Sequence, residues 1–333
     1  MHSSFPRRRL LAVLALASAL GSGTVRAQAP APADAFPVPG KAVTLILPAV
    51  GGSTGDRVLR MFADRLKDDW KVPVIVEAKP GAGGEIGSAF VARAAPDGHT
   101  ILLGFSHLVQ AYAFNKTPPY DAMKDLVPIA RICDLPMLYL TGDPSIQKMD
   151  DVVAKVKASG QGSYGSYGNA TTSHIYSELV NRRNNLGMAH AAYRGTPPLI
   201  TDLLAGHITT AVIDLGNTMT HIKAGKLKPL AVTGTKRNRL VPDVPTFAEL
   251  GYRDVSLPGR YWLMLPAGTP APTVERIRAS VLKVLKAPEV QEQMLAMGIE
   301  PAPAEREDVA ADMRADVEYW KRVVQITGIT SSQ

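Results

Sequence analysis

The sequence has almost no cysteine: Cys133 is the single one among 333 residues. One cysteine excludes a disulfide within the chain, and its place in the apolar run 129–140 predicts a small buried side chain rather than a nucleophile. Beyond residue 27 the chain has no run of about 18 apolar residues, the length that a membrane-spanning helix requires. It also lacks lysine and arginine runs interleaved with aromatic residues, so nothing favours nucleic acid as a partner.

Motifs that mark hydrolases and metalloenzymes are scarce as well. No HExxH or CxxC pattern occurs, and we expect no nucleophile elbow. His174 and Glu178 share a helix face, but two ligands without a third make a poor metal site. We therefore expect no enzyme, no metal and no cofactor. A secreted hydrolase or carboxylate transferase stays open as an alternative, because catalytic triads are geometric; its candidate groups are Ser106, His107, Ser166, Thr171 and His174.

The first 27 residues have the pattern of a secretory signal peptide. Three arginines at 7–9 precede a short apolar run, 10–20, and Val25-Arg26-Ala27 places small residues at the −3 and −1 positions of a cleavage site. Removing this segment lowers the formal charge from +7 to +3, because it holds four arginines and no acidic residue. We expect cleavage after Ala27, a flexible lead-in over 28–37, and a periplasmic mature protein.

Strand-like and helix-like segments alternate along the remaining chain. The apolar content of 46% and the length allow two domains with a sizeable core. Alternating order predicts the α/β class, with parallel or mixed sheets and helices on both faces. Two helices are expected to close the chain, over 272–297 and 305–324. Strands are expected at 42–47, 73–77, 100–104, 136–141, 162–166, 188–192, 210–213, 229–233 and 261–265.

Four small polar turns each connect an extended segment to a helix start. The clearest reads KPGAGGEIG (79–87), where glycines leave the backbone N–H groups accessible and a helix N-terminus adds partial positive charge. PAVGGSTGD (48–56), GSYGSYGNATTSH (162–174) and YRGTPP (193–198) follow the same order. Because ligands bind at this end of the strands in open α/β sheets, the four turns predict an anion site.

With these motifs in this order, the chain resembles the solute-binding receptors of tripartite tricarboxylate transporters, the Bug-type receptors. The resemblance extends from about Phe36 to the C-terminus. The segments that carry it are VIVEAKPGAGGEIGSAFVARAAPDGHTILLG (74–104), PPYDAMKDLVPIARI (118–132), SYGNATTSHIYSEL (166–179), YRGTPPLITDLLAGHI (193–208), AGKLKPLAVTGTKRNRLVPDVPTFAELGY (224–252) and YWLMLPAGTP (261–270).

The resemblance implies a two-lobed periplasmic binding protein that closes around a small carboxylate, a di- or tricarboxylate. It places lobe 1 at 38–138 plus 257–333 and lobe 2 at 139–256. It also implies a two-subunit membrane permease as transient partner, and we expect a monomer. Two alternatives stay open: a receptor that presents its ligand to a sensor, and a receptor of the ATP-driven transporter type for sugars or amino acids.

The resemblance also assigns ligand-binding residues in lobe 1. Asp56 is either a helix cap or a ligand contact, and His107 either packs or reads the ligand. The residues assigned in lobe 1 are Gly52, Ser53, Thr54, Asp56, Gly81, Ala82, Gly83, Gly84, Ser106 and His107.

In lobe 2, Ala170 replaces the more usual glycine, so its backbone must suit an alanine. Tyr167 either packs or stacks on a flat ligand, and His174 is expected to orient its loop by hydrogen bonding. Arg194 either clamps a carboxylate or lies on the lobe surface. The assigned residues are Ser166, Tyr167, Gly168, Asn169, Thr171, Thr172, His174, Tyr193, Arg194, Gly195, Thr196 and Asp214.

Overall fold

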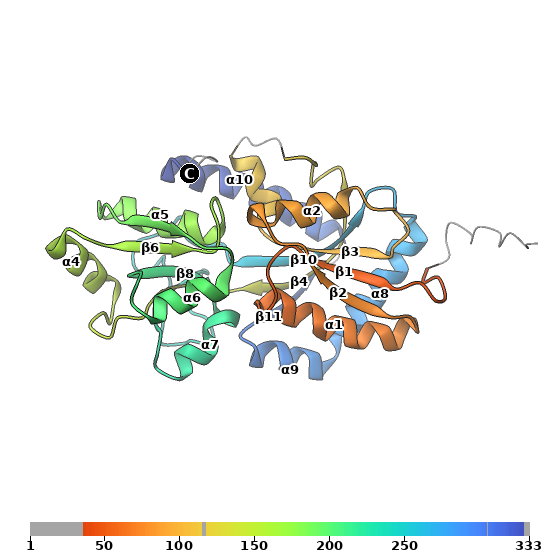
Figure 1. The fold of residues 1–333 in the computed structure, drawn as a ribbon, viewed down its shortest axis with the longest axis horizontal. Helices are drawn as coiled ribbons and strands as arrows, with labels where there is room; N and C mark the ends of the chain where they lie inside the picture. The colour runs from red at the N-terminus through yellow and green to blue at the C-terminus, as the bar shows by residue number, and fades with distance from the viewer. Residues whose placement is uncertain (1–35, 115–117, 305, 330–333) are drawn as a thin grey trace, which may run out of the picture. The chain divides into compact units, whose positions relative to one another are not determined.

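The computed structural model describes residues 36–114, 118–304 and 306–329 (Figure 1). The predicted signal peptide and most of the predicted lead-in, residues 1–35, lie outside the described residues. Among the helices of the described ranges, none is long and apolar enough to cross a membrane.

Lobe 1 is built on a six-stranded mixed sheet with the order β11-β4-β10-β3-β1-β2. Strands β2, β1 and β3 are parallel, whereas β10 runs antiparallel to β3 and β4, and β11 antiparallel to β4. The strands are β1 (Val43–Leu47), β2 (Val74–Ala78), β3 (Thr100–Gly104), β4 (Leu126–Leu135), β10 (Gly259–Pro266) and β11 (Glu300–Ala304).

Helices cover both faces of this sheet (Figure 1). One apolar cluster joins the sheet to α2, α3 and α10, and a second joins its other face to α1, α8 and α9. The helices of lobe 1 are α1 (Thr54–Trp70), the 3-10 turn η1 (Ala82–Gly84), α2 (Glu85–Ala92), α3 (His107–Ala113), α8 (Ala271–Lys286), α9 (Pro288–Ala296) and α10 (Arg306–Thr327).

Lobe 2 is built on a five-stranded mixed sheet with the order β7-β6-β8-β5-β9. Its apolar faces pack against α4 and α5 on one side and against α6 and α7 on the other. Its elements are β5 (Met137–Thr141), α4 (Met149–Ser159), β6 (Ser163–Ser166), α5 (Thr172–Arg183), β7 (Ala189–Ala192), α6 (Thr196–Leu204), β8 (Thr210–Asp214), α7 (Leu215–Lys223) and β9 (Lys228–Val232).

The chain passes between the two sheets at two places. The first is Pro136, between β4 and β5, and the second lies between Val232, where β9 ends, and Gly259, where β10 begins. The two passages meet, because Gly259 pairs with Leu135 in the antiparallel ladder of β10 and β4. The α/β class with two lobes is as predicted, while the exact domain limits stay a prediction.

Alternation along the strands explains why these segments lie at the centre of the sheet. In β1, Val43, Leu45 and Leu47 belong to one apolar cluster and Ile46 to the cluster on the opposite face. Helix α1 follows the 3.6-residue period, and its apolar stripe, which includes Phe62 and Leu66, is fully buried. Burying one such side chain contributes about 1.5–3 kcal/mol.

Two predictions about segments were wrong, and proline explains both. The helix expected over 272–297 is two helices, because Ala287 takes an extended conformation directly before Pro288. Strands β4 and β11 were not predicted, because each carries proline: Pro128 lies in β4, and β11 reads EPAPA. Strand β11 is the edge of its sheet, where proline is tolerated. Cys133, in β4, is buried and unpaired, as predicted.

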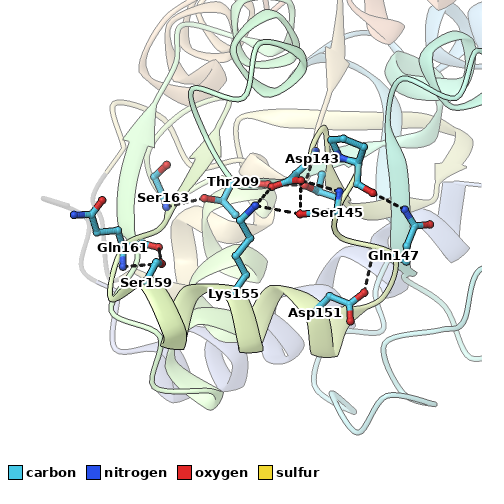
Figure 2. A network of polar contacts seen from close by, with 11 residues as sticks. Asp143, Ser145, Gln147, Asp151, Lys155, Ser159, Gln161, Ser163 and Thr209 are labelled. Carbon is cyan, nitrogen blue, oxygen red and sulfur yellow. Dashed lines mark hydrogen bonds and ion pairs between the residues drawn. The ribbon is translucent and has the colours of Figure 1, made fainter.

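A polar network fixes the connection from β5 to α4 (Figure 2). Asp143 accepts hydrogen bonds from Lys155 and from the Oγ and the N–H of Ser145, which together lower the pKa of its carboxyl to about 2. Asp151 accepts from the N–H of Gln147 (2.9 Å) at the start of α4. This network places α4 against its sheet, and its residues do not line the cavity described below.

Helix α10 contacts both lobes. It packs against α3 in lobe 1 and against α5 in lobe 2, where the ring of Trp320 stacks on Tyr176 at 5.2 Å. The hydroxyl of Tyr319 donates to the carbonyl of Asp254 (2.6 Å) and accepts from the N–H of Ser256 (3.0 Å). The helix therefore reaches across the second passage between the sheets.

Candidate ligand site

A cavity of about 740 Å³ lies between loops of the two lobes. This volume is within the usual range of about 300–1,000 Å³ for small-molecule sites. Helices α1 and α2 of lobe 1 and helices α5 and α6 of lobe 2 all begin at residues that line the cavity or adjoin its lining. Because helix N-termini carry partial positive charge and unpaired N–H groups, the arrangement favours an anion.

The first loop contributes less to the lining than predicted. Ser53 lines the cavity, whereas Gly52, Thr54 and Asp56 do not. Ser53 caps α1, with its Oγ accepting from the Asp56 N–H at 3.4 Å. The Asp56 carboxylate accepts in return from the Gly52 N–H at 3.0 Å and pairs with Arg60. Asp56 therefore has the capping role of the two that the sequence left open.

Thr54 joins the first loop to lobe 2. Its Oγ1 donates to a carboxylate oxygen of Asp214 at 2.7 Å, and its N–H donates to the side chain of Asn217 at 3.0 Å. Asp214 lines the cavity, but it also accepts from the N–H of Asn217 and so caps α7. Both carboxylate oxygens of Asp214 already accept hydrogen bonds, because Asn217 Nδ2 donates to the second one at 2.6 Å.

The second loop lines the cavity with all four predicted residues, Gly81 to Gly84. Its three glycines have positive φ, and Ala82 also lies in the left-handed region with φ of 48°. A Cβ on Gly83 would lie 3.8 Å from the Asn169 carbonyl oxygen, so this loop faces lobe 2 directly. The lack of side chains is what allows that approach.

Ser106 and His107 both line the cavity and are both buried. The Nε2 of His107 hydrogen bonds to Ser88 Oγ at 2.7 Å, while its Nδ1 is buried without a hydrogen-bond partner among the described residues. Burial lowers the pKa of His107 to about 3, so the ring is neutral. A Cβ on Gly84 would lie 2.8 Å from this ring, so the imidazole supports the second loop from behind.

The third loop lines the cavity with five of the seven predicted residues: Tyr167, Gly168, Asn169, Thr171 and Thr172. Ser166 and His174 lie behind them. Ser166 Oγ donates to the carbonyl oxygen of Gly168 at 3.0 Å, and Thr171 Oγ1 donates to the same oxygen at 2.7 Å. The loop is therefore held in shape by hydroxyl groups that its own sequence supplies.

His174 makes the loop-orienting hydrogen bond that was expected of it. Its Nδ1 accepts from the N–H of Ala170 at 3.1 Å, and Ala170 has a positive φ of 56°. Its ring stacks on His190 with centroids 3.8 Å apart. Burial, followed by the proximity of His190, lowers the pKa of His174 to about 4. A neutral ring is required, because a protonated Nδ1 could not accept from Ala170.

The fourth loop lines the cavity with Tyr193, Arg194, Gly195 and Thr196, as predicted. Arg194 is exposed and makes no hydrogen bond or ion pair with any residue of the described ranges. A Cβ on Gly195 would lie 2.7 Å from Val50, so this loop also touches lobe 1. The guanidinium of Arg194 is thus free to meet an anion.

The remaining lining residues were not among the predicted site residues. Some lie in the first two predicted turns or in helices α3 (His107–Ala113) and α7 (Leu215–Lys223). Others fall at the two passages between the sheets and along one apolar wall, where the rings of Phe105 and Tyr261 lie 4.8 Å apart. The predicted lobe boundaries near 138 and 257 could have identified the lining residues next to them, because the ligand was expected to bind between the lobes. They are Pro48, Ala49, Val50, Pro80, Glu85, Phe105, Gln110, Leu135, Met137, Ala192, Asn217, Gly259, Arg260 and Tyr261.

The expectation that no nucleophile elbow occurs overlooked one pattern. Residues 51–55 read GGSTG, which has the spacing G-x-S-x-G. In the structure Ser53 is a helix cap, and no histidine of the described ranges hydrogen bonds to it. The described residues also contain no group of three or more His, Cys, Asp or Glu side chains that could hold a metal ion.

These features define a two-lobed α/β binding protein with its ligand cavity between the lobes. A family model described as the tripartite tricarboxylate transporter family receptor matches residues 58–329. The chain belongs to this family, which confirms the resemblance noted from its motifs. It is 33% identical to a protein encoded in the tcbD–tcbE intergenic region of Pseudomonas sp. strain P51, over 97% of both chains. It is 30% identical to BugT of Bordetella pertussis, over 96% of this chain and 98% of BugT.

Solved structures agree with this assignment. The periplasmic binding protein BugD is 30% identical with a TM-score of 0.82, covering 88% of this chain and 99% of BugD. Rpa4515 of R. palustris, solved with adipate, is 25% identical with a TM-score of 0.82, over 88% and 99% of the two chains. MatC of Rhodopseudomonas palustris, solved with malate, is 25% identical with a TM-score of 0.79, over 86% and 100%.

Proposed function

We propose that this chain is a periplasmic receptor that captures a small di- or tricarboxylate between its lobes and delivers it to a two-subunit membrane permease. The observation that carries the proposal is the convergence of four helix N-termini, two from each lobe, on one cavity. The adipate and malate complexes of related receptors support a carboxylate as ligand. On this proposal the chain acts as a monomer and binds no nucleic acid.

Capture is proposed to occur by closure of the lobes. Contacts join the two lobes around the cavity: Gln110 Nε2 donates to Thr172 Oγ1 at 2.8 Å, and Thr54 Oγ1 donates to Asp214 at 2.7 Å. The backbone of Gly83 also faces Asn169, and that of Gly195 faces Val50. Opening the lobes would break these contacts. A ligand that binds both lobes therefore shifts the equilibrium toward the closed state, which the permease would recognise.

We also infer that the chain binds its ligand without transforming it. Within the described ranges two serine–histidine pairs occur, Ser88 with His107 and Ser166 with His190, each at 2.7 Å. Both serines are fully buried and neither lines the cavity. Their hydroxyls cannot reach a bound substrate, so neither pair has the geometry of a nucleophile and its base.

The test is thermal unfolding of the mature chain, refolded to remove carried ligand, with dicarboxylates, tricarboxylates, aromatic carboxylates and amino acids. A ligand at a hundred times its Kd adds about 2.7 kcal/mol, which raises Tm by about 4 °C for a chain of this length. A selective rise with carboxylates supports the proposal. The same change in Tm with every compound of the panel, or no change with any, would reject a carboxylate as the ligand.

Delivery is tested separately, by uptake into proteoliposomes that contain the two permease subunits. Uptake of the identified carboxylate should require both the receptor and the permease. Binding without receptor-dependent uptake would reject the transport role and favour a receptor that signals instead.

A further inference from the structure

Arg260 is a second arginine in the cavity wall, and it was not among the assigned site residues. It lies at the start of β10 in lobe 1, directly after the second passage between the sheets. Arg194 lies in the fourth loop, which belongs to lobe 2. Among the described residues that line the cavity, these two are the only arginines and no lysine accompanies them. Each lobe thus contributes one guanidinium to the cavity wall, that of Arg260 being paired with carboxylates and that of Arg194 being unpaired.

Buried carboxylates hold Arg260 in place. Its Nη1 donates to both carboxylate oxygens of Asp316 at 2.7 Å each, and its Nε lies 3.6 Å from Asp134. The side chain of Arg260 is 13% exposed and that of Asp316 is 5% exposed. Because burial of a charged pair is costly, this pair contributes little net stability, but its two hydrogen bonds fix the orientation of the guanidinium.

Not every N–H donor of the Arg260 guanidinium is used by a hydrogen bond within the described residues. A guanidinium has five N–H groups, and the contacts to Asp316 use only those on Nη1. Nε is buried without a hydrogen-bond partner in the described ranges, and Nη2 makes no hydrogen bond there. Nη2 can therefore donate to a ligand carboxylate while Asp316 holds Nη1 and Asp134 faces Nε.

The surrounding charges show how firmly the arginine is held. Asp134, Asp312 and Asp316 face Arg260 and Arg131, so three acidic groups meet two guanidiniums. Burial and this acidic excess raise the pKa of Asp316 to about 6. The cluster joins β4, β10 and α10 at the rung where Asp134 pairs with Arg260 in the ladder.

We propose that Arg260 and Arg194 each bind one carboxylate of a dicarboxylate ligand, one from each lobe, and that Asp316 positions Arg260 for this contact. The inference rests on the proposed function as a carboxylate receptor and specifies its ligand as an anion with two separated carboxylates. Such a ligand bridges the lobes by charge as well as by backbone N–H groups. A monocarboxylate of the same length satisfies only one of the two arginines.

The test compares affinities for succinate and adipate with those for butanoate and hexanoate, which have the same carbon numbers. Wild type should bind the better diacid about 10- to 100-fold more tightly than its monoacid, the worth of one charged hydrogen-bonded pair. Arg260→Gln should abolish most of that preference while monoacid affinity changes little. Arg260→Lys, which keeps the positive charge but not the planar guanidinium, should restore part of the diacid preference.

Controls separate this role from a structural one. Glu318→Gln alters the same helix at an exposed residue that pairs with Lys321, outside this cluster, and should leave the diacid preference unchanged. Arg260→Gln alone leaves the buried carboxylate of Asp316 without its partner, which could prevent folding. The double variant Arg260→Gln with Asp316→Asn removes that charge and serves as the second test variant. Asp316→Asn alone should lower diacid affinity more than monoacid affinity.

Two outcomes would overturn the inference. Loss of diacid and monoacid affinity by equal factors in Arg260→Gln would make the arginine structural. Equal affinity of wild type for diacid and monoacid would reject the proposal that two arginines bind the ligand, but it would not reject the proposed function as a carboxylate receptor. Failure of every carboxylate to bind wild type would instead reject the proposed function itself.

Discussion

The second and third loops face each other across the cavity, yet they are held in opposite ways. The second loop, 81–84, has three glycines and no polar side chain, and it is shaped by positive φ angles and by the ring of His107 behind Gly84. The third loop, 166–172, is tied by hydrogen bonds that the hydroxyls of Ser166 and Thr171 donate and by one that His174 accepts from Ala170.

The difference shows two solutions to one requirement, the presentation of N–H groups to an anion. A bare loop must have nothing added to it, because its fit depends on empty space. A hydroxyl-rich loop should not lose its side chains, because their hydroxyls hydrogen bond to loop backbone groups such as the carbonyl of Gly168. Both loops nevertheless place one alanine in the left-handed region, Ala82 and Ala170.

The largest effect is expected from adding one methyl group to the bare loop. Gly84→Ala should lower the free energy of unfolding by about 2–5 kcal/mol, since the residue has φ of 111° and its Cβ would meet the His107 ring at 2.8 Å. Urea unfolding measures the loss. Gly187→Ala is the matched control, because Gly187 also has positive φ but open space around it. Equal losses in the two variants would show that the ring does not support the loop.

The next effect separates closure from folding. Gly83→Val should reduce ligand affinity about tenfold or more, because its methyl groups extend past the Cβ position that already lies 3.8 Å from Asn169 and Thr171 of lobe 2. Gly83→Ala also takes a left-handed conformation, with φ of 68°, but its Cβ makes only an ordinary contact, so it should bind almost normally. Isothermal titration gives both values. Unchanged affinity of the valine variant would remove the second loop from the site.

The third prediction concerns pH and the hydroxyl-rich loop. The pKa of His174 is about 4 in the folded chain against the ordinary value of 6.5, so between these values the unfolded state binds the proton and the native state does not. Stability should therefore fall as pH falls from 6.5 toward 4, by at most about 1.4 kcal/mol per pH unit from this residue. His107 acts in the same direction, since its pKa is lowered to about 3.

Urea unfolding at several pH values checks this prediction. The slope of stability against pH should be smaller in His174→Gln, which cannot take up the proton. An identical slope in wild type and variant would show that other groups cause the dependence.

The smallest effect tests what the two loops share. Ala170→Gly and Ala82→Gly should each stabilise the chain by about 0.5 kcal/mol, since relief of left-handed strain slightly exceeds the added entropy of the unfolded chain. Ala205→Gly, at a right-handed position with φ of −79°, should destabilise it instead. Thermal unfolding of the three variants gives the comparison. A loss at both loop positions would mean that neither alanine is strained.

Much of the site was predictable because its signals are local. The glycines of 81–84 and the strand β3 at Thr100–Gly104 follow from neighbours within a few residues, and the α/β rule brings successive loops to one sheet edge. The rule does not say which side chain of a loop faces the ligand. Thr54, Asp56 and His174 lie in predicted loops but support the lining rather than form it.

The sequence alone determined the alternation of strands and helices, the bare and hydroxyl-rich turns, and the family to which the chain belongs. Tertiary structure alone decided the partners of Arg260, because Asp134 and Asp316 are distant in the chain and meet only through ladder register and helix packing. It also decided that Asp214 caps α7 and bonds Thr54 of the other lobe. Local preferences act over a few residues, whereas the burial and pairing of charges depend on which surfaces the fold brings together.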